Sequence, residues 1–142
     1  MKVKDVKKWF EIAKPNPTTE DACVQIGCHY EEVGEMAMAL FDDGISLCCD
    51  ELADEYKLKG YNNNLTYLLD SEERIELLDS LCDQIVTAIG VAHMLGMDID
   101  GALNEVNKSN HSKFENGKAV FDENGKIRKG KDYFPPDLTK FI

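Results

Sequence analysis

Apolar residues recur at intervals of three and four along most of this chain, which is the spacing of one face of an α-helix. The first such segment covers Val3 to Ala13, and the Pro-Asn-Pro sequence at 15–17 ends it, because proline disfavours helical backbone at the preceding residue. A second segment begins at Thr18 or Thr19, either of which is a suitable N-cap, and extends to about Phe41. Its apolar positions are Ala22, Ile26, Val33, Met36, Ala37 and Leu40.

The same periodicity predicts three further helices. Asp-Asp-Gly at 42–44 interrupts the pattern, which resumes from Ile45 to Leu58. A polar stretch from Gly60 to Asn64 predicts a loop, and the longest helix then runs from Ser71 to about Leu95. A last helix is expected from Ile99 to near Asn110.

The remainder of the chain is different in character. Lys118 to Phe121 and Lys126 to Lys129 flank Asp-Glu-Asn-Gly at 122–125, a pattern that predicts a small hairpin or an irregular turn. The two prolines at 135 and 136 exclude a further helix there. The sequence therefore predicts an all-α fold, a bundle of about five helices with a short irregular or hairpin tail, in one domain spanning residues 1–142.

The net charge narrows the range of partners. Twenty-seven acidic against sixteen basic residues give a formal charge of −11, which disfavours nucleic-acid binding because like charges repel. No apolar run is long enough to span a membrane, and Met1 to Asp5 lack the features of a secretory signal, so we expect a cytoplasmic protein. The five cysteines include the adjacent pair Cys48 and Cys49, and this odd, uneven set argues against a disulfide framework.

A zinc site is a weak alternative for the remaining cysteines. Cys23, Cys28 and His29 lack the paired spacing typical of zinc ligands. We expect the cysteines to be reduced, small, buried hydrophobic residues.

Carboxylates are grouped on two of the predicted helices. Glu31 and Glu32 each lie within one turn of Glu35, an arrangement that costs helix stability through repulsion unless a cation lies among them. On the long helix Asp79 and Asp83 are four residues apart, and the apolar stripe around Asp83 predicts that its side chain approaches the core. Mg²⁺ prefers such oxygen ligands, although two solvated acidic faces would give the same spacing.

Taken together, these motifs resemble the MazG-like all-α nucleoside triphosphate pyrophosphohydrolases, which include phosphoribosyl-ATP pyrophosphohydrolase. Glu32-x-x-Glu35 is similar to the first family motif, and Asp83 with the apolar helix ending at Leu95-Gly96 is similar to the second. The stretch from Gly101 to Phe114, and the tail from Gly125 to Leu138, resemble the downstream helix and tail of small bacterial and bacteriophage members.

The resemblance implies Mg²⁺-dependent hydrolysis (Mn²⁺ being the other candidate ion) of a nucleoside triphosphate to the monophosphate and pyrophosphate, in a homodimer or homotetramer. It implies that the metal ligands are Glu32, Glu35 and Asp83, with Asp79 as a fourth. Glu31 is the candidate general base or orienting residue. The implied substrate-binding residues are Asn107, Asn110, Lys113 and Lys129.

Two points stay open at this stage. Ser80 replaces the Glu expected three residues before Asp83, whereas Glu51-x-x-Asp54 keeps the literal motif at a compatible distance from Glu35. We favour Asp83, because the acidic stretch from Asp50 to Glu55 has the pattern of a solvated face whereas Asp83 lies in an apolar stripe. An inactive nucleotide-sensing or interaction protein on the same scaffold is the alternative function. A di-iron carboxylate bundle lacks its Glu-x-x-His motifs, and the loop at 122–125 lacks the ligand pattern of a calcium-binding EF-hand.

Overall fold

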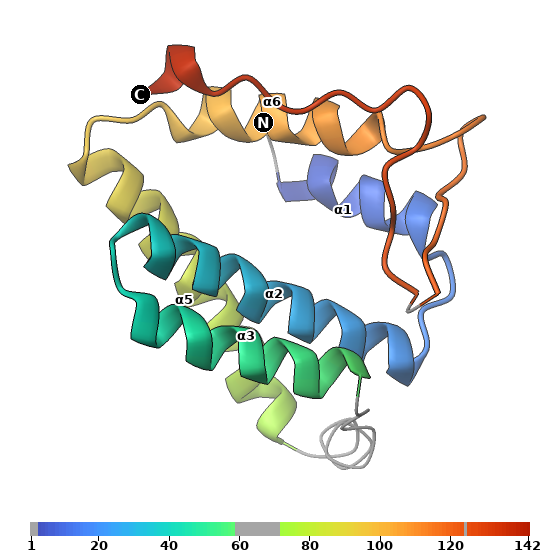
Figure 1. Ribbon diagram of the computed structural model, residues 1–142, viewed down its shortest axis with the longest axis horizontal. Coiled ribbons are helices and arrows are strands. Elements are labelled where there is room, and N and C mark those ends of the chain that lie inside the picture. Colours follow the sequence, from blue (N-terminus) through green and yellow to red (C-terminus); the bar gives the residue numbers. More distant parts are fainter. Residues whose placement is uncertain (1–2, 59–71, 124) are drawn as a thin grey trace. The chain divides into compact units, whose positions relative to one another are not determined.

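The computed structural model describes residues 3–58, 72–123 and 125–142, and these residues form an all-α protein. Its helices are α1 (Val3–Ala13), α2 (Thr19–Ala39), α3 (Asp43–Leu58), α5 (Glu73–Met94) and α6 (Ile99–His111), followed by the short 3₁₀ helix η1 (Thr139–Phe141) (Figure 1). The predicted fold class is confirmed, with helix ends close to those expected. The predicted loop at 60–64 and the start of the long helix at Ser71 lie outside the described residues.

The chain divides into two compact units. The two-helix unit consists of Asn16–Ser71 and Glu123–Lys126, and it contains α2 and α3. The terminal unit consists of Met1–Pro15, Glu72–Asp122 and Ile127–Ile142, and it contains α1, α5, α6 and η1.

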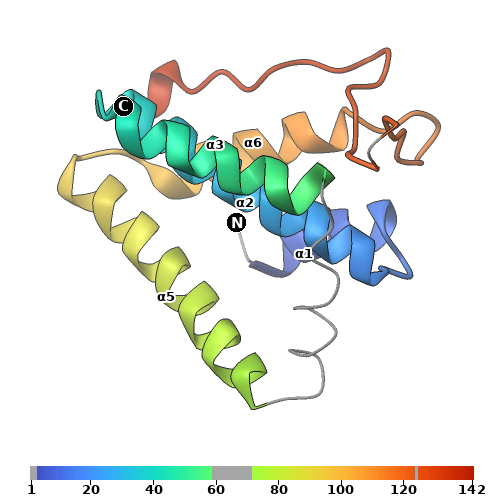
Figure 2. The ribbon, with the colours of Figure 1, turned by 60° about the horizontal axis from the view of Figure 1, so that its bottom comes forward.

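In the two-helix unit, α2 and α3 lie side by side along most of their length (Figure 1 and Figure 2). A Cβ atom added to Gly27 would lie 2.7 Å from the carbonyl oxygen of Ala53, whereas one added to Gly34 would lie 3.1 Å from Cβ of Cys49. Because the later position on α2 faces the earlier position on α3, the helices are antiparallel. Every fully buried residue of the pair is small: Cys23, Gly27, Gly34, Ala37, Ser46, Cys49 and Ala53.

This interface corrects the predicted apolar face of α2. Ala37 is buried as expected, but Met36 and Leu40 are exposed, because two helix backbones this close together have room only for small side chains between them. The cysteines also differ in burial. Cys23 and Cys49 are buried at the interface, whereas Cys48 and Cys82 are exposed, and all five are free thiols.

Local signals in the sequence define both ends of α2. Thr18 and Asp21 form a capping box, in which the Thr18 hydroxyl accepts from the Asp21 N–H at 3.2 Å and the Asp21 carboxylate accepts from the Thr18 N–H at 2.9 Å. At the other end Phe41 has φ 63°, and the Asp42 N–H donates to the carbonyl of Ala37 at 2.9 Å, which closes a Schellman turn. Asp42 then accepts from the Ile45 N–H and starts α3.

In the terminal unit, α1 packs against α6 through Trp9. The indole N–H of this buried residue donates to the carbonyl of Asn110 at 2.8 Å, and its ring stacks on Phe114. The tail follows α6 back towards its start, since Ser109 donates to the carbonyl of Phe134 at 2.8 Å and the Asp98 N–H donates to that of Phe141.

Two other features of the terminal unit bear on the sequence predictions. The predicted hairpin is present as an isolated antiparallel bridge between Phe121 and Ile127, not as full strands. Along α5 only Ala92 is buried, so the expected apolar stripe, which includes Ile75, Leu78, Ile85 and Ile89, is exposed in the chain as described.

Candidate functional site

Glu31, Glu32 and Glu35 all lie on α2, where Glu31 is half-buried and the other two are exposed. The register of the two-helix unit defines what lies beside them on α3. Gly27 lies against Ala53 and Lys57, and Gly34 lies against Ser46, Cys49 and Asp50, so α2 at 31–32 is level with α3 at about 50–51. Glu51 therefore lies level with Glu31 and Glu32, and Asp54 lies about one turn further along α3.

Three of these carboxylates, Glu31, Glu35 and Asp54, share one side of the helix pair. At about 100° per residue, Glu31 and Glu35 are rotated from the line of Gly27 and Gly34 in the same sense that Asp54 is rotated from Ala53. In antiparallel helices, rotation in the same sense leads to the same side of the pair. Glu32 and Glu51 are rotated by about 150° from the same lines, so each points nearly away from the partner helix.

The chemistry of these donors suits Mg²⁺, because all of them are carboxylates. Within residues 3–58, 72–123 and 125–142, however, no three His, Cys, Asp or Glu side chains converge closely enough to hold a metal ion. The exposed Glu32, Glu35, Glu51 and Asp54 would have to rotate their side chains to do so. These carboxylates are suitable ligands for Mg²⁺, but in the structure they do not converge on one metal position.

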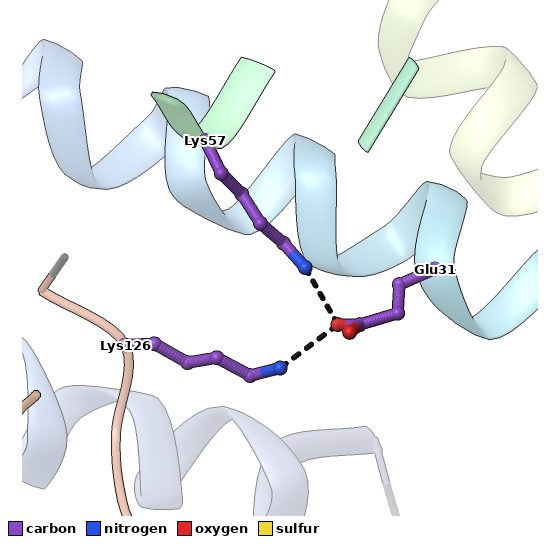
Figure 3. A network of polar contacts seen from close by, with 3 residues as sticks. All are labelled: Glu31, Lys57 and Lys126. Carbon is purple, nitrogen blue, oxygen red and sulfur yellow. Dashed lines mark hydrogen bonds and ion pairs between the residues drawn. The ribbon is translucent and has the colours of Figure 1, made fainter. Parts of the chain in front are cut away.

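Glu31 differs from the other carboxylates because two lysines bind it. Lys57 of α3 donates to Oε2 of Glu31 at 2.7 Å, and Lys126 of the tail donates to the same oxygen at 2.8 Å (Figure 3). The exposed fractions of the three side chains are 13% for Lys57, 34% for Glu31 and 45% for Lys126. The network is thus partly buried at Lys57 and opens to solvent at Lys126.

The protonation of the network follows from these contacts. Burial acts to raise the pKa of Glu31, but the hydrogen bonds and charges of Lys126 and Lys57 outweigh it, so the pKa is lowered. The hydrogen bond to Glu31 raises the pKa of Lys126. Nearby, burial raises the pKa of the Cys28 thiol, so this cysteine is a neutral neighbour and not a reactive thiolate.

Sequence reasoning did not identify Lys57 or Lys126. Lys57 follows Ala53 by four residues and so shares the face of α3 that meets α2, a signal available once that face is known. Lys126 comes from a tail segment 95 residues from Glu31, and no local pattern predicts that contact.

Asp79 and Asp83 lie on α5 in the terminal unit, and both are exposed. The expectation that Asp83 approaches the core side of its helix is wrong, because its apolar neighbours Ile85 and Val86 are themselves exposed. Their role as metal ligands stays a prediction.

The four predicted substrate-binding residues also lie in the terminal unit. Asn107 and Asn110 are half-buried on one face of α6, and Lys113 follows the end of that helix. A Cβ atom at Gly130 would lie 2.6 Å from the carbonyl oxygen of Lys113, so the tail passes directly against this turn. The Lys129 ammonium lies 4.8 Å from the ring centre of Tyr133.

Comparison of the chain with protein-family models, with curated proteins and with solved structures found no match. Among the described helices none has both the length and the apolar character needed to cross a membrane.

Proposed function

We propose that this chain is a Mg²⁺-dependent nucleoside triphosphate pyrophosphohydrolase, which converts a ribo- or deoxyribonucleoside triphosphate to its monophosphate and pyrophosphate. The observation that carries the proposal is the antiparallel α2–α3 pair. Its packing puts Glu31 and Glu35 of α2 on the same side of the helix pair as Asp54 of α3, with Glu51 level with Glu31 and Glu32 along the helix axis. Repelling carboxylates gathered on one side of a close-packed helix pair favour a cation-dependent role.

We infer that Glu51 and Asp54 of α3 hold the metal with Glu32 and Glu35 of α2, with the side chains of Glu32 and Glu51 turned toward the side that Glu35 and Asp54 share. The sequence had favoured Asp79 and Asp83 over this set. When bound, the ion would neutralise phosphate charge and lower the pKa of a coordinated water.

Glu31 fits an orienting role better than that of a general base. Its two lysine partners lower its pKa, and a carboxylate with a lowered pKa is a poorer proton acceptor. Lys113 would bind phosphate, and the amides of Asn107 and Asn110 would donate hydrogen bonds to phosphate, sugar or base. Lys129 is a further candidate phosphate contact.

The proposal includes self-association as a homodimer or homotetramer. The exposed apolar residues of α5 give such an assembly a surface to cover. Light scattering coupled to size-exclusion chromatography measures the mass directly, and a monomer at micromolar concentration would contradict this part.

An inactive nucleotide-binding protein is the second candidate. It is favoured by one observation: among the residues described, no three potential ligands converge on a metal position. Binding of a triphosphate without turnover would identify it.

The deciding experiment is a panel of the common and modified nucleoside triphosphates, with alarmones and phosphoribosyl-ATP, incubated with Mg²⁺ and separated by anion-exchange chromatography. We expect equal amounts of monophosphate and pyrophosphate from at least one substrate and none in excess EDTA. Orthophosphate with a diphosphate would indicate attack at the γ-phosphate and a different enzyme. Full activity in EDTA would exclude the metal-dependent mechanism.

A further inference from the structure

The lysine pair on Glu31 is the feature that the predicted roles leave unexplained. Two ammonium groups lie within about 5.5 Å of each other, because both contact one oxygen at 2.7 and 2.8 Å. Such groups repel, and a single carboxylate offsets only part of their charge. The three side chains together carry +1 in a chain of net charge −11.

The position of Lys57 and Lys126 indicates a role for their excess positive charge. Glu31 is adjacent to Glu32 and one turn before Glu35, so the two lysines stand next to the proposed metal ligands. Bound polyphosphate needs both a metal ion and cationic side chains around its oxygens. Lys126 and Glu31 are 45% and 34% exposed, which leaves the network accessible to an incoming anion.

We propose that Lys57 and Lys126 bind the polyphosphate chain of the substrate, and that the Glu31 carboxylate occupies the position between the two ammonium groups until a phosphate oxygen displaces it. This inference rests on the proposed function for the identity of the substrate. It assigns phosphate recognition to a helix lysine and a tail lysine, with Glu31 as the internal anion that the phosphate displaces.

Titration of inorganic tripolyphosphate by isothermal calorimetry, with EDTA present, tests the inference separately from catalysis. Lys126→Met should weaken binding about tenfold through loss of a charged hydrogen bond, and Lys57→Met should do the same while keeping the aliphatic stem. Glu31→Gln should tighten binding about threefold, because it removes the competing carboxylate charge. Lys118→Met removes the same charge from an exposed tail position and should change affinity less than twofold.

The sign of the Glu31→Gln effect separates phosphate binding from a merely structural tie. If the network only fastens the tail to α2, Glu31→Gln lowers the melting temperature and leaves tripolyphosphate affinity unchanged, which overturns the inference. An equal loss in Lys118→Met and Lys126→Met, or no binding by the unmodified protein, overturns it as well. Circular dichroism melts identify a variant that fails to fold, and Lys126→Met, at the exposed end, then carries the test.

Failure of the inference and failure of the proposed function give different results. A protein that hydrolyses a nucleoside triphosphate, but whose lysine variants bind tripolyphosphate normally, contradicts the lysine assignment alone. A protein that binds tripolyphosphate through these lysines and hydrolyses no nucleotide contradicts the enzymatic proposal alone.

Discussion

Replacing Gly27 by alanine tests the close packing of α2 on α3 directly. The added Cβ would lie 2.7 Å from the Ala53 carbonyl oxygen and 2.6 Å from Cγ of Lys57, whereas ordinary contact begins at about 3.4 Å. The lysine stem can move aside, but the carbonyl belongs to the backbone of α3. The helices must therefore separate by several tenths of an ångström at this point.

Two opposing terms set the expected free energy. Overpacking of a tight interface costs about 1–3 kcal/mol, and alanine in a helix interior gains about 1 kcal/mol over glycine. We expect Gly27→Ala to lower the free energy of unfolding by about 1 kcal/mol. Because Lys57 must shift, tripolyphosphate binding should weaken as well.

Gly90→Ala is the matched control, since Gly90 lies inside α5 and a Cβ atom there meets nothing within 4 Å. Helix propensity then acts alone, and this variant should gain up to about 1 kcal/mol. Urea denaturation followed by far-ultraviolet circular dichroism measures both. A Gly27→Ala protein as stable as Gly90→Ala would refute the close approach of the two helices.

Four further results are expected. Asp54→Asn should lower kcat about 100-fold and Asp83→Asn only a fewfold, since a misplaced metal removes charge stabilisation. The reverse order in steady-state kinetics would mean that the metal ligands are Asp79 and Asp83 of α5. Saturating Mg²⁺ should raise the melting temperature by relieving carboxylate repulsion, and an unchanged value would mean that the acidic faces are simply solvated. Ser109→Ala should lower the free energy of unfolding by about 1–3 kcal/mol in the same urea assay, because the Phe134 carbonyl loses the hydrogen bond from the hydroxyl of this buried serine. Unchanged stability would mean that this contact does not hold the tail. The pKa of Glu31 is lowered in the folded protein, so its ionised form stabilises the fold. This stabilisation is complete above an ordinary glutamate pKa and is lost as the pH falls through the pKa of Glu31 in the folded protein. Glu31→Gln should therefore make the loss of unfolding free energy at acid pH less steep.

The helices could be predicted because their signals are local. The prolines before Thr18, its capping box with Asp21 and the Asp-Asp-Gly break after Phe41 act within a few residues, and the observed ends agree with them. Periodicity predicted a buried face of α2 and correctly included Ala37, but it also included Met36 and Leu40, and both are exposed. Spacing alone does not show whether a helix interface is formed by large apolar side chains or by two backbones in close approach. Gly27 and Gly34 permit such a close approach, and Met36 at the interface would prevent it.

The same difference between local and long-range signals applies to the candidate site. Glu32, Glu35 and the Glu51-x-x-Asp54 motif are visible as spacings, but only the packing of α3 on α2 shows on which side of the helix pair each carboxylate lies. The Lys126 contact to Glu31 depends on where the tail returns in space. Such long-range contacts follow from tertiary packing, which a single sequence does not encode in any local pattern.

The contrast between the two units has a consequence for the order of folding. Residues that meet across α2 and α3 are close in sequence and joined by a short turn, so little loop entropy is lost when they pair. In the terminal unit the indole of Trp9 meets its acceptor 101 residues away, and that contact must wait for a much larger loop to close. We expect the two-helix unit to acquire its amide-exchange protection first during refolding, and the burial of Trp9 to be among the last events to change the intrinsic fluorescence.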